Sequence, residues 1–287
     1  MLTNTTEKTQ TKPAVIQIRG LTKSFADQQV LGGIDLDVFQ GEIMVIMGGS
    51  GCGKSTLLRH LVGSIRPDDG SVKMFGQEIT TMAEHQLNEV RKRFGILFQS
   101  GALINSLSVG ENVALPLREH TGLDANTIEI MVKIKLELVG LRAHADKMPA
   151  QLSGGMKKRA GLARAIALDP QILFYDEPGA GLDPVTGAQI DRLIIDLTRK
   201  LNVTSVVVTH QMDSAFNIAD RMCMLDKGVI LKTGTRQEFE TLRDTALEEL
   251  STEQDKLIRQ FIRGDAEGPL AKRKVHSDYE EDLLQAK

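Results

Sequence analysis

The sequence has few of the features that would place the protein outside a reducing compartment or inside a membrane. It has two cysteines, Cys52 and Cys223, too few for a disulfide framework and too far apart for a zinc site. Its longest apolar runs, such as Val203 to Val208, fall far short of the roughly 20 residues needed to cross a bilayer. The N-terminal segment, MLTNTTEKTQTK, lacks the apolar core of a secretion signal, so we expect a disordered leader over residues 1–13. These absences favour a cytosolic protein that does not span a membrane but can work beside one.

The charge balance also lacks a strong excess of either sign. The 287 residues include 35 Lys plus Arg against 38 Asp plus Glu, which gives a formal charge of −3 and a pI near 6.1. Such a chain has no global basic field, which argues against a protein that wraps nucleic acid. With 41% hydrophobic and 25% charged residues, the composition predicts a globular protein with a large core and excludes disorder throughout.

The first part of the chain predicts two kinds of strand. Apolar residues alternate with polar ones over Val15 to Ile18 and Ile34 to Val38, which indicates a small antiparallel sheet with one solvent-facing side. The run Ile43 to Met47 is apolar throughout and too short for a helix. It ends in glycines, and a helical pattern follows over Ser55 to Leu61. The order strand, loop, helix is typical of an α/β protein.

The middle of the chain changes to helical periodicity. Leu87 to Arg93 and Ile128 to Val139 have charged outer faces, and Pro116 and Pro149 interrupt the pattern, so we expect an inserted α-helical subdomain at about residues 83–155.

The parallel sheet is expected to resume after this insertion. Ile172 to Tyr175 and Val203 to Thr209 are short, β-rich apolar runs separated by a helical stretch over Thr186 to Leu201. The predicted fold class is therefore α/β, with an antiparallel β subdomain and the helical insertion.

A glycine-rich segment lies between the apolar run and the helix of the first part. It fits the pattern GxxxxGK[S/T], whose glycines let the backbone approach phosphate and whose N–H groups and helix start attract anions. Lys54 is expected to reach the β and γ phosphates of ATP, and the Ser55 hydroxyl to bind Mg²⁺. The alternative is a glycine-rich turn with a solvated lysine, but a chance match has a probability of about one in a hundred. The expected ATP-binding residues are Gly48, Gly49, Ser50, Gly51, Cys52, Gly53, Lys54, Ser55 and Thr56.

Two adjacent carboxylates follow the next apolar run. Asp176 would hold Mg²⁺ through water, and Glu177 is the candidate general base for the attacking water. Alone, this pattern equally fits a strand that ends in a solvated acidic turn. Together with the phosphate-binding segment, it indicates nucleotide hydrolysis.

The stretch Leu152-Ser153-Gly154-Gly155-Met156 completes a pattern that resembles the ATP-binding-cassette family over residues 14 to about 240. The resemblance implies a P-loop NTPase with a RecA-like core, ATP and Mg²⁺ as cofactors, and further site residues. The further site residues that the resemblance implies are Phe25, which would stack on adenine, and Gln99, which would contact Mg²⁺ and the attacking water. Asp183 would belong to the D-loop, and His210 would be the switch histidine.

The signature segment has a position that the family resemblance explains. Ser153 opens a helix, so one chain carries two helix starts that attract phosphate. In the family, Ser153, Gly154 and Gly155 would contact ATP held by the opposite subunit of a head-to-tail homodimer. The alternative is an ordinary serine-capped helix. The chain departs from the family pattern at Met156, where glutamine is frequent, and at Gly181, where alanine is usual.

A closer resemblance is to ATPases of lipid transporters that contain MCE-domain proteins, in particular the Mla phospholipid system. It rests on Phe98 to Leu103, Ser106 to Val113, Leu152 to Arg159, and the ending from Gly268 to Leu284. It implies a subunit at the cytoplasmic face of the bacterial inner membrane that drives phospholipid transport between inner and outer membranes and maintains outer-membrane lipid asymmetry. The implied partners are two integral-membrane permease subunits, an MCE-domain periplasmic protein and a STAS-domain protein, with no nucleic acid.

Two other functions remain open from the residues alone. One is the ATPase of an importer for amino acids or other small solutes. The other is a cassette protein acting on nucleic acid or the ribosome, although a single copy of each motif, 99 residues (153 minus 54) from Lys54 to Ser153 and no sustained heptads favour transport.

The C-terminal part, residues 245–287, exceeds a minimal ATPase domain. It predicts a helix with an apolar stripe that packs on its own domain or on a second subunit, followed by an extended tail that crosses to the other ATPase. The stripe consists of Leu257, Ile258, Phe261 and Ile262.

Overall fold

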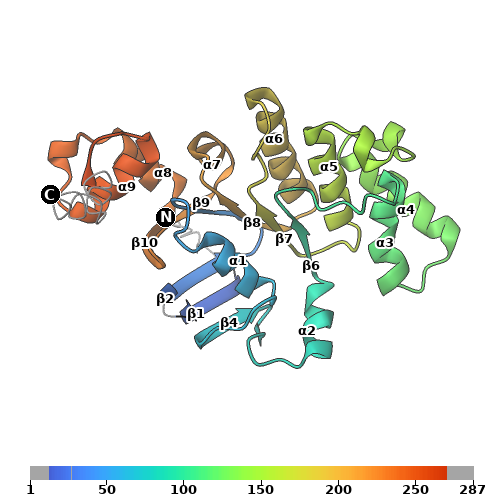
Figure 1. Cartoon of the computed structure of the whole chain (residues 1–287), viewed down its shortest axis with the longest axis horizontal. Coiled ribbons are helices and arrows are strands. Elements are labelled where there is room, and N and C mark those ends of the chain that lie inside the picture. Colours follow the sequence, from blue (N-terminus) through green and yellow to red (C-terminus); the bar gives the residue numbers. More distant parts are fainter. Residues whose placement is uncertain (1–12, 27, 270–287) are drawn as a thin grey trace, which may run out of the picture.

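Two sheets with helices around them form the computed structural model, which describes residues 13–26 and 28–269 (Figure 1). The larger sheet has the strand order β10-β9-β3-β8-β7-β6. All neighbouring strands in it are parallel except the edge strand β10, which runs antiparallel to β9. The strands are β3 (Ile43–Met47), β6 (Phe94–Leu97), β7 (Ile172–Asp176), β8 (Thr204–Thr209), β9 (Arg221–Asp226) and β10 (Val229–Thr235). The α/β expectation is confirmed.

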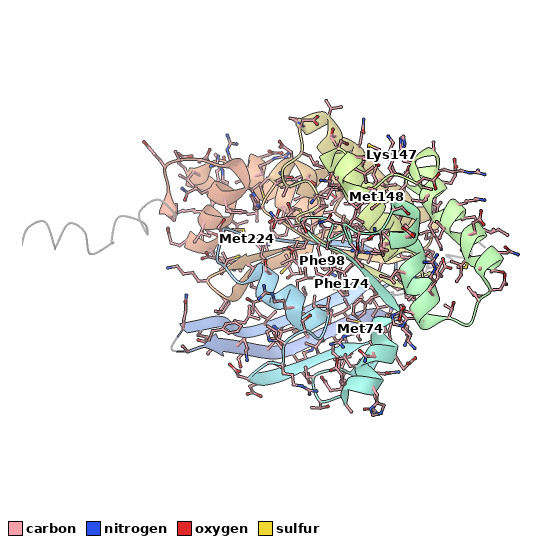
Figure 2. All side chains as sticks on the ribbon, turned by 45° about the vertical axis from the view of Figure 1, so that its right-hand side comes forward. Met74, Phe98, Lys147, Met148, Phe174 and Met224 are labelled. Atoms are coloured by element: carbon pink, nitrogen blue, oxygen red, sulfur yellow. The ribbon has the colours of Figure 1, made fainter. Side chains whose placement is uncertain are left out.

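The smaller sheet is antiparallel and has the order β2-β1-β4-β5. Its strands are β1 (Ala14–Phe25), β2 (Gln28–Phe39), β4 (Asp69–Met74) and β5 (Gln77–Glu78). Helix α1 (Lys54–Leu61) shares a core with this sheet and with one face of the larger sheet. Phe174 of β7 belongs to that core and lies inside the molecule (Figure 2). Helix α1, which follows the glycine-rich segment, is therefore packed between the two sheets.

The other face of the larger sheet has its own core. Met44 and Ile46 of β3 point into the first core, whereas Val45 and Met47 point into the second, as the period-two geometry of a strand requires. Both faces are covered, so the strand reads as a continuous apolar run. The helices are α2 (Glu84–Arg91), α3 (Val109–His120), α4 (Ala125–Leu138), α5 (Gly154–Ala165), α6 (Pro184–Lys200), α7 (Met212–Ile218), α8 (Arg236–Asp244) and α9 (Glu253–Arg263).

The range expected to be helical, 83–155, contains a strand of the larger sheet. Strand β6 pairs in parallel with β7, with Ile96 opposite Phe174, so the sheet continues into this range. Helix α2 before it packs with the antiparallel sheet, and only α3 and α4 after it form the helical extension together with α5. Pro116 lies within α3 and does not interrupt it. A four-residue buried strand has too short a pattern to separate from a helix by periodicity.

The apolar stripe of α9 packs on its own domain. Leu257, Ile258 and Ile262 are buried in the same core as Phe239 of α8, with Phe261 half-buried against it. The expected leader, apart from Pro13, and the crossing tail beyond residue 269 lie outside the described residues. Within the part of the chain that the structure describes, we find no helix that is both long and apolar enough to span a bilayer.

Candidate active site

Two glycines of the P-loop between β3 and α1 lie where packing leaves no room for a side chain. A Cβ atom on Gly48 would lie 2.1 Å from the Leu225 carbonyl oxygen of β9. One on Gly53 would lie 2.8 Å from Leu31 Cδ2, and the φ of +108° at Gly53 favours glycine independently. Strands β9 and β2 therefore require glycine at these two positions of the loop, as the glycine-rich pattern predicts.

Lys54 and the start of α1 form the anion-attracting part of this loop. Lys54 is only 8% exposed, and its Nζ donates hydrogen bonds to the carbonyl oxygens of Gly48 at 2.7 Å and Gly49 at 2.9 Å. The N-cap Gly53 has no side chain to accept bonds from the first turn, which also contains no acidic residue. The Ser55 hydroxyl is exposed beside it. Uncapped N–H groups and a fixed ammonium group are together the features expected of a phosphate site.

Cys52 fills space within the loop. It is buried, with Sγ 3.8 Å from Lys54 Nζ, and burial raises the pKa of its thiol. The thiol therefore stays protonated at neutral pH and is a poor nucleophile.

Asp176 and Glu177 lie at the carboxyl end of β7, where parallel strands commonly place ligands. Burial raises the pKa of Asp176, and the adjacent charge of Glu177 acts in the same direction. The cations Lys158, Arg59 and Lys54 oppose this rise, in that order. Two acidic groups are thus held together in a region with several positive charges.

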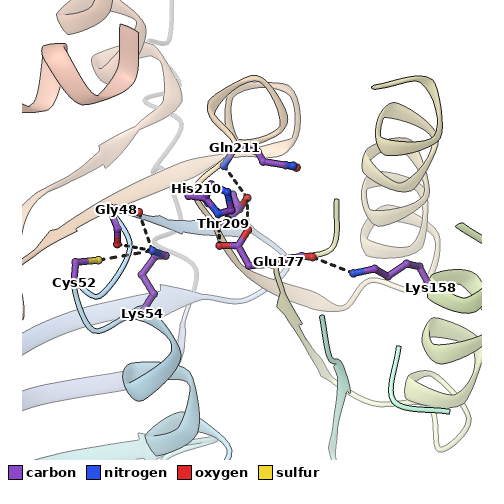
Figure 3. Close-up of polar contacts among 9 residues, drawn as sticks. Gly48, Cys52, Lys54, Lys158, Glu177, Thr209, His210 and Gln211 are labelled. Atoms are coloured by element: carbon purple, nitrogen blue, oxygen red, sulfur yellow. Dashed lines mark hydrogen bonds and ion pairs between the residues drawn. The ribbon is translucent and has the colours of Figure 1, made fainter. Parts of the chain in front are cut away.

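Glu177 has the unusual backbone and the most contacts of these residues. Its φ is +47°, a left-handed conformation that non-glycine residues adopt at a cost of about 1–2 kcal/mol. Its Oε1 accepts a hydrogen bond from His210 Nδ1 at 2.8 Å, and Oε2 accepts one from Thr209 Oγ1 at 3.2 Å (Figure 3). The structure therefore joins the expected general base and the switch histidine directly, from β7 and from the end of β8.

The signature segment starts α5, well apart from α1 of the same chain (Figure 1). Ser153 is the N-cap, and its Oγ accepts a hydrogen bond from Met156 N at 3.3 Å. Ser153 and Gly154 are exposed, whereas Gly155 is buried so closely that a Cβ atom would lie 2.5 Å from Thr186 Cγ2. The structure thus does not bring the signature to its own P-loop.

Comparison with known proteins places this combination of sites in one family. Residues 31–180 match the family model for the ABC transporter. The chain belongs to the ABC transporter family. It is an ATPase subunit that hydrolyses ATP to drive transport.

Relatives from two transport systems resemble this ABC ATPase to a similar degree. MlaF of the intermembrane phospholipid transport system of Haemophilus influenzae is 41% identical, over 94% of this chain and 98% of the relative. MlaF of Escherichia coli K12 is 42% identical, over 94% and 96%. The probable ribonucleotide transport ATP-binding protein mkl of Mycobacterium leprae is 42% identical, over 89% and 70%.

A solved ABC structure shares the fold. It is the dimeric structure of an ATP-binding cassette in a post-hydrolysis state, bound to ADP and Pi. It matches this chain at 30% identity with a TM-score of 0.71, covering 77% of this chain and 98% of that one. The P-loop NTPase fold with antiparallel and helical subdomains is therefore confirmed.

The segment expected to be the D-loop of this ABC ATPase has a backbone that suits one departure from the family pattern, Gly181. Gly181 has a φ of +76°, a conformation in which glycine is unstrained. Asp183 follows as the N-cap of α6, where Oδ1 accepts hydrogen bonds from Val185 N and Thr186 N at 3.1 and 3.0 Å. Val185 is 69% exposed at this helix start. The D-loop thus presents an ordered, partly apolar edge next to the signature.

The remaining expected site residues lie at the edges. Phe25 is 46% exposed at the end of β1, and Lys23 Nζ lies 5.5 Å from its ring centroid. Gln99 is exposed two residues after the end of β6. Both side chains are accessible to a ligand.

The donor set fits one hydrated magnesium ion bound together with a nucleotide. Asp176 offers a half-buried carboxylate and Ser55 an exposed hydroxyl, which are oxygen ligands suited to Mg²⁺. Across residues 13–26 and 28–269, no group of three or more His, Cys, Asp and Glu side chains could hold a metal by itself. This agrees with the usual binding of Mg²⁺ through one or two carboxylates, water and substrate phosphates.

Lys158 is a site residue that the motifs did not single out. It lies in α5, and its Nζ donates a hydrogen bond to the Glu177 carbonyl oxygen at 3.1 Å. The sequence contained a signal, because Gly155, Lys158 and Leu162 are spaced to share one face of a helix, and that face is buried.

Proposed function

We propose that this ABC ATPase drives phospholipid transport between the inner and outer membranes. The observation that carries the proposal is the 41% identity to the phospholipid-system ATPase of H. influenzae, which extends over 98% of that relative. The identity to the mycobacterial ATPase is 42% but covers only 70% of that relative, and this similarity makes a small-solute importer, here for ribonucleotides, the second candidate.

The catalytic unit in this proposal is a homodimer with two ATP molecules between its chains. Two features support it. The exposed Ser153 and Gly154 lie on a helix apart from their own P-loop, and a related cassette at 30% identity forms a dimer bound to ADP and Pi. Each chain would provide the P-loop and Glu177 for one ATP site. It would provide Ser153, Gly154 and Gly155 for the other ATP site. The apolar edge at Val185 would be covered in this dimer.

Within each site, the residues have distinct tasks. Lys54 exchanges its bonds to the loop carbonyls for bonds to phosphate oxygens, and the N–H groups of α1 bind the same anion. Glu177 accepts the proton of the attacking water, and His210 orients Glu177 and the γ phosphate. Ser55, Gln99 and Asp176, the last through water, would hold Mg²⁺, which supplies charge neutralisation at the phosphates. Phe25 would stack on adenine.

A groove beside Gln99 is suited to receive a membrane partner. It has a volume of about 710 Å³ and lies between α2, β6, α3 and α5. Phe98, 42% exposed, lies at its wall one residue before Gln99. In our proposal a loop of each permease subunit occupies this groove, so ATP-driven changes at Gln99 reach the membrane. The further partners are an MCE-domain periplasmic protein and a STAS-domain protein, and the ATPase is peripheral at the cytoplasmic face of the inner membrane.

Co-purification from native membranes tests the transport assignment. The tagged chain is expected to bring down a permease, an MCE-domain protein, a STAS-domain protein and bound phospholipid identified by mass spectrometry. The same co-purification with a Glu177→Gln chain shows which partners bind when the complex assembles but does not hydrolyse ATP. Recovery of a soluble periplasmic solute-binding protein with no MCE-domain protein would overturn the phospholipid proposal in favour of the importer.

A further inference from the structure

A buried lysine lies in the helix that begins with the signature. Lys158 is 4% exposed on the buried face of α5, beside Gly155 and Leu162. Burying an ammonium group is costly unless it is hydrogen-bonded or balanced by opposite charge. A lysine at this position therefore needs a specific partner.

That partner is the peptide group of the catalytic glutamate. Lys158 Nζ donates to the Glu177 carbonyl oxygen at 3.1 Å (Figure 3). Ala180 N donates to the same oxygen at 3.1 Å. The charges of Asp176 and Glu177 act on the lysine from a longer distance. The contact is thus a hydrogen bond to the backbone, balanced by the field of the two acids.

The bond supports a strained part of the backbone. Glu177 has a φ of +47°, which is a strained conformation for a non-glycine residue. The next residue is Pro178, which has no backbone N–H to donate and so cannot help to hold this segment by a hydrogen bond of its own. Glu177 N in turn donates to Val208 O at 2.9 Å. Hydrogen bonds at both the amide and the carbonyl of Glu177 therefore hold the left-handed conformation that aims the carboxylate at His210.

The same helix carries two functional groups at a fixed separation. Ser153 and Lys158 are five residues apart (158 minus 153), or about 7.5 Å along the helix axis. Because a helix moves as a unit, a displacement of Ser153 also displaces the donor to Glu177.

We propose that Lys158 is a positioning residue that holds Glu177 of its own chain and links this base to the signature of the same chain. When the signature of one chain binds the nucleotide held by the partner, it then sets the geometry of Glu177 in the site built on its own chain's P-loop. This inference rests on the proposed ATP-sandwich dimer. It assigns to one buried side chain a coupling between the two sites.

Steady-state kinetics of the full chain in its transport complex tests the positioning. Lys158→Met removes the donor and the charge with little change in volume, Lys158→Arg retains both, and Lys157→Met is the control on the same helix. We expect Lys158→Met to lower kcat at least about tenfold and to change KM for ATP by less than about twofold, because only the base is misplaced. Lys158→Arg should recover most of kcat. An unchanged kcat, or a loss that Lys158→Arg does not recover, would overturn the assignment.

Mixed dimers, purified through two different tags, test the link within one chain. In the first, a Lys158→Met chain pairs with a Glu177→Gln chain, so the only intact Glu177 lies next to the substituted lysine. In the second, one chain carries both substitutions and the other carries neither. The reference pairs a Glu177→Gln chain with an unsubstituted one. Turnover should fall at least about tenfold below the reference in the first and stay within about twofold in the second. The reverse order would place Lys158 at the signature contact and overturn the proposal.

A separate measurement distinguishes failure of the dimer from failure of this inference. The Glu177→Gln chain is incubated with ATP and Mg²⁺, and its mass is measured by light scattering. A dimer together with an unaltered kcat of Lys158→Met would overturn only the role of Lys158. Absence of a dimer would overturn both the proposed dimer and the link between sites, while the kcat and KM values would still decide whether Lys158 positions Glu177.

Discussion

The chain contains two glycine-rich helix starts that differ in how complete they are. At α1, Gly48 and Gly53 are in contact with β9 and β2, and Lys54 is bonded to the loop itself. At α5, Ser153 caps its own helix and, like Gly154, is exposed. The first start is packed against two strands of its own chain at Gly48 and Gly53, whereas the second is exposed at Ser153 and Gly154. In the proposed dimer, similar sequences therefore form one finished phosphate site and one surface that a partner completes.

The acidic residues repeat this contrast. Asp176, near the P-loop, is half-buried, and burial raises its pKa. Asp183, near the signature, is exposed, and bonds from Thr186 and Val185 lower its pKa. The proposed phosphate site thus contains a carboxyl group whose charged form is disfavoured, while the proposed partner-facing edge contains one whose charged form is favoured. Function at the P-loop end comes at the expense of local stability.

The largest expected effect separates chemistry from binding at the P-loop end. Glu177→Gln removes the base but retains an amide of the same size, so kcat should fall roughly 10²–10⁴-fold. The ATP dissociation constant should change by less than about threefold, because Glu177 does not bind the phosphates. Phosphate-release kinetics and nucleotide titration measure the two quantities. Wild-type turnover in this variant would show that Glu177 is not the base.

The next effect concerns the finished phosphate site itself. Lys54→Ala removes a charge-assisted donor and leaves a cavity in the loop, so ATP should bind at least about 100-fold more weakly, or about 2.7 kcal/mol. Calorimetric titration with ATP and Mg²⁺ measures this change. Lys73→Ala, at an exposed position of β4, is the control and should bind ATP as the parent does.

Residues with local signals were the ones that the sequence predicted well. The P-loop, the end of β7 and the N-cap Ser153 depend on short-range features such as glycine backbone freedom, a buried strand and helix capping. Each is set within a few residues of the chain. Their positions in the structure agree with the pattern for that reason.

Features that depend on distant packing could not be predicted in the same way. Strand β6 has four residues and is identified only by its pairing with β7. Lys158 is separated by 19 residues (177 minus 158) from the carbonyl that it contacts, and no motif encodes that bond. Pro116 lies inside α3, although a local pattern treats proline as a break. The pairing of β6 and the bond of Lys158 were decided by tertiary contacts.

A pair of glycine substitutions sharpens the contrast between the two helix starts. Gly48→Ala would place Cβ 2.1 Å from the Leu225 carbonyl oxygen, whereas Gly154→Ala would place it 3.3 Å from Leu182 Cδ2, a flexible side chain. We expect Gly48→Ala to lower the free energy of unfolding by about 2–3 kcal/mol and Gly154→Ala by less than about 1 kcal/mol. Urea unfolding of the isolated chain measures both. Equal losses would mean that the signature segment is as tightly enclosed as the P-loop.

The smallest expected effect tests the contrast between the two acids by its sign. Because burial raises the pKa of Asp176 in the folded chain, the folded state binds that proton more tightly than the unfolded state. The charged carboxylate therefore opposes folding at neutral pH, and this opposition fades as the pH falls through the folded pKa. Without nucleotide, Asp176→Asn should have a higher free energy of unfolding than the parent at pH 7.5, by at most about 1 kcal/mol after solvent screening. Urea unfolding measures this difference, which should disappear toward pH 4.

Asp183→Asn is the matched test at the other helix start, where the sign is reversed. Its folded pKa is lowered by the capping bonds from Thr186 and Val185, so the charged form stabilises the chain at neutral pH and this contribution is lost on acidification. The variant should therefore be slightly less stable than the parent at pH 7.5, and this difference in stability should persist to about pH 4 and narrow only below it, as the pH falls through the lowered folded pKa. If both variants shifted stability in the same direction at pH 7.5, the raised and lowered pKa values would not reflect the enclosed and open environments. The distinction between a finished site and a partner-dependent surface would then have to rest on packing alone.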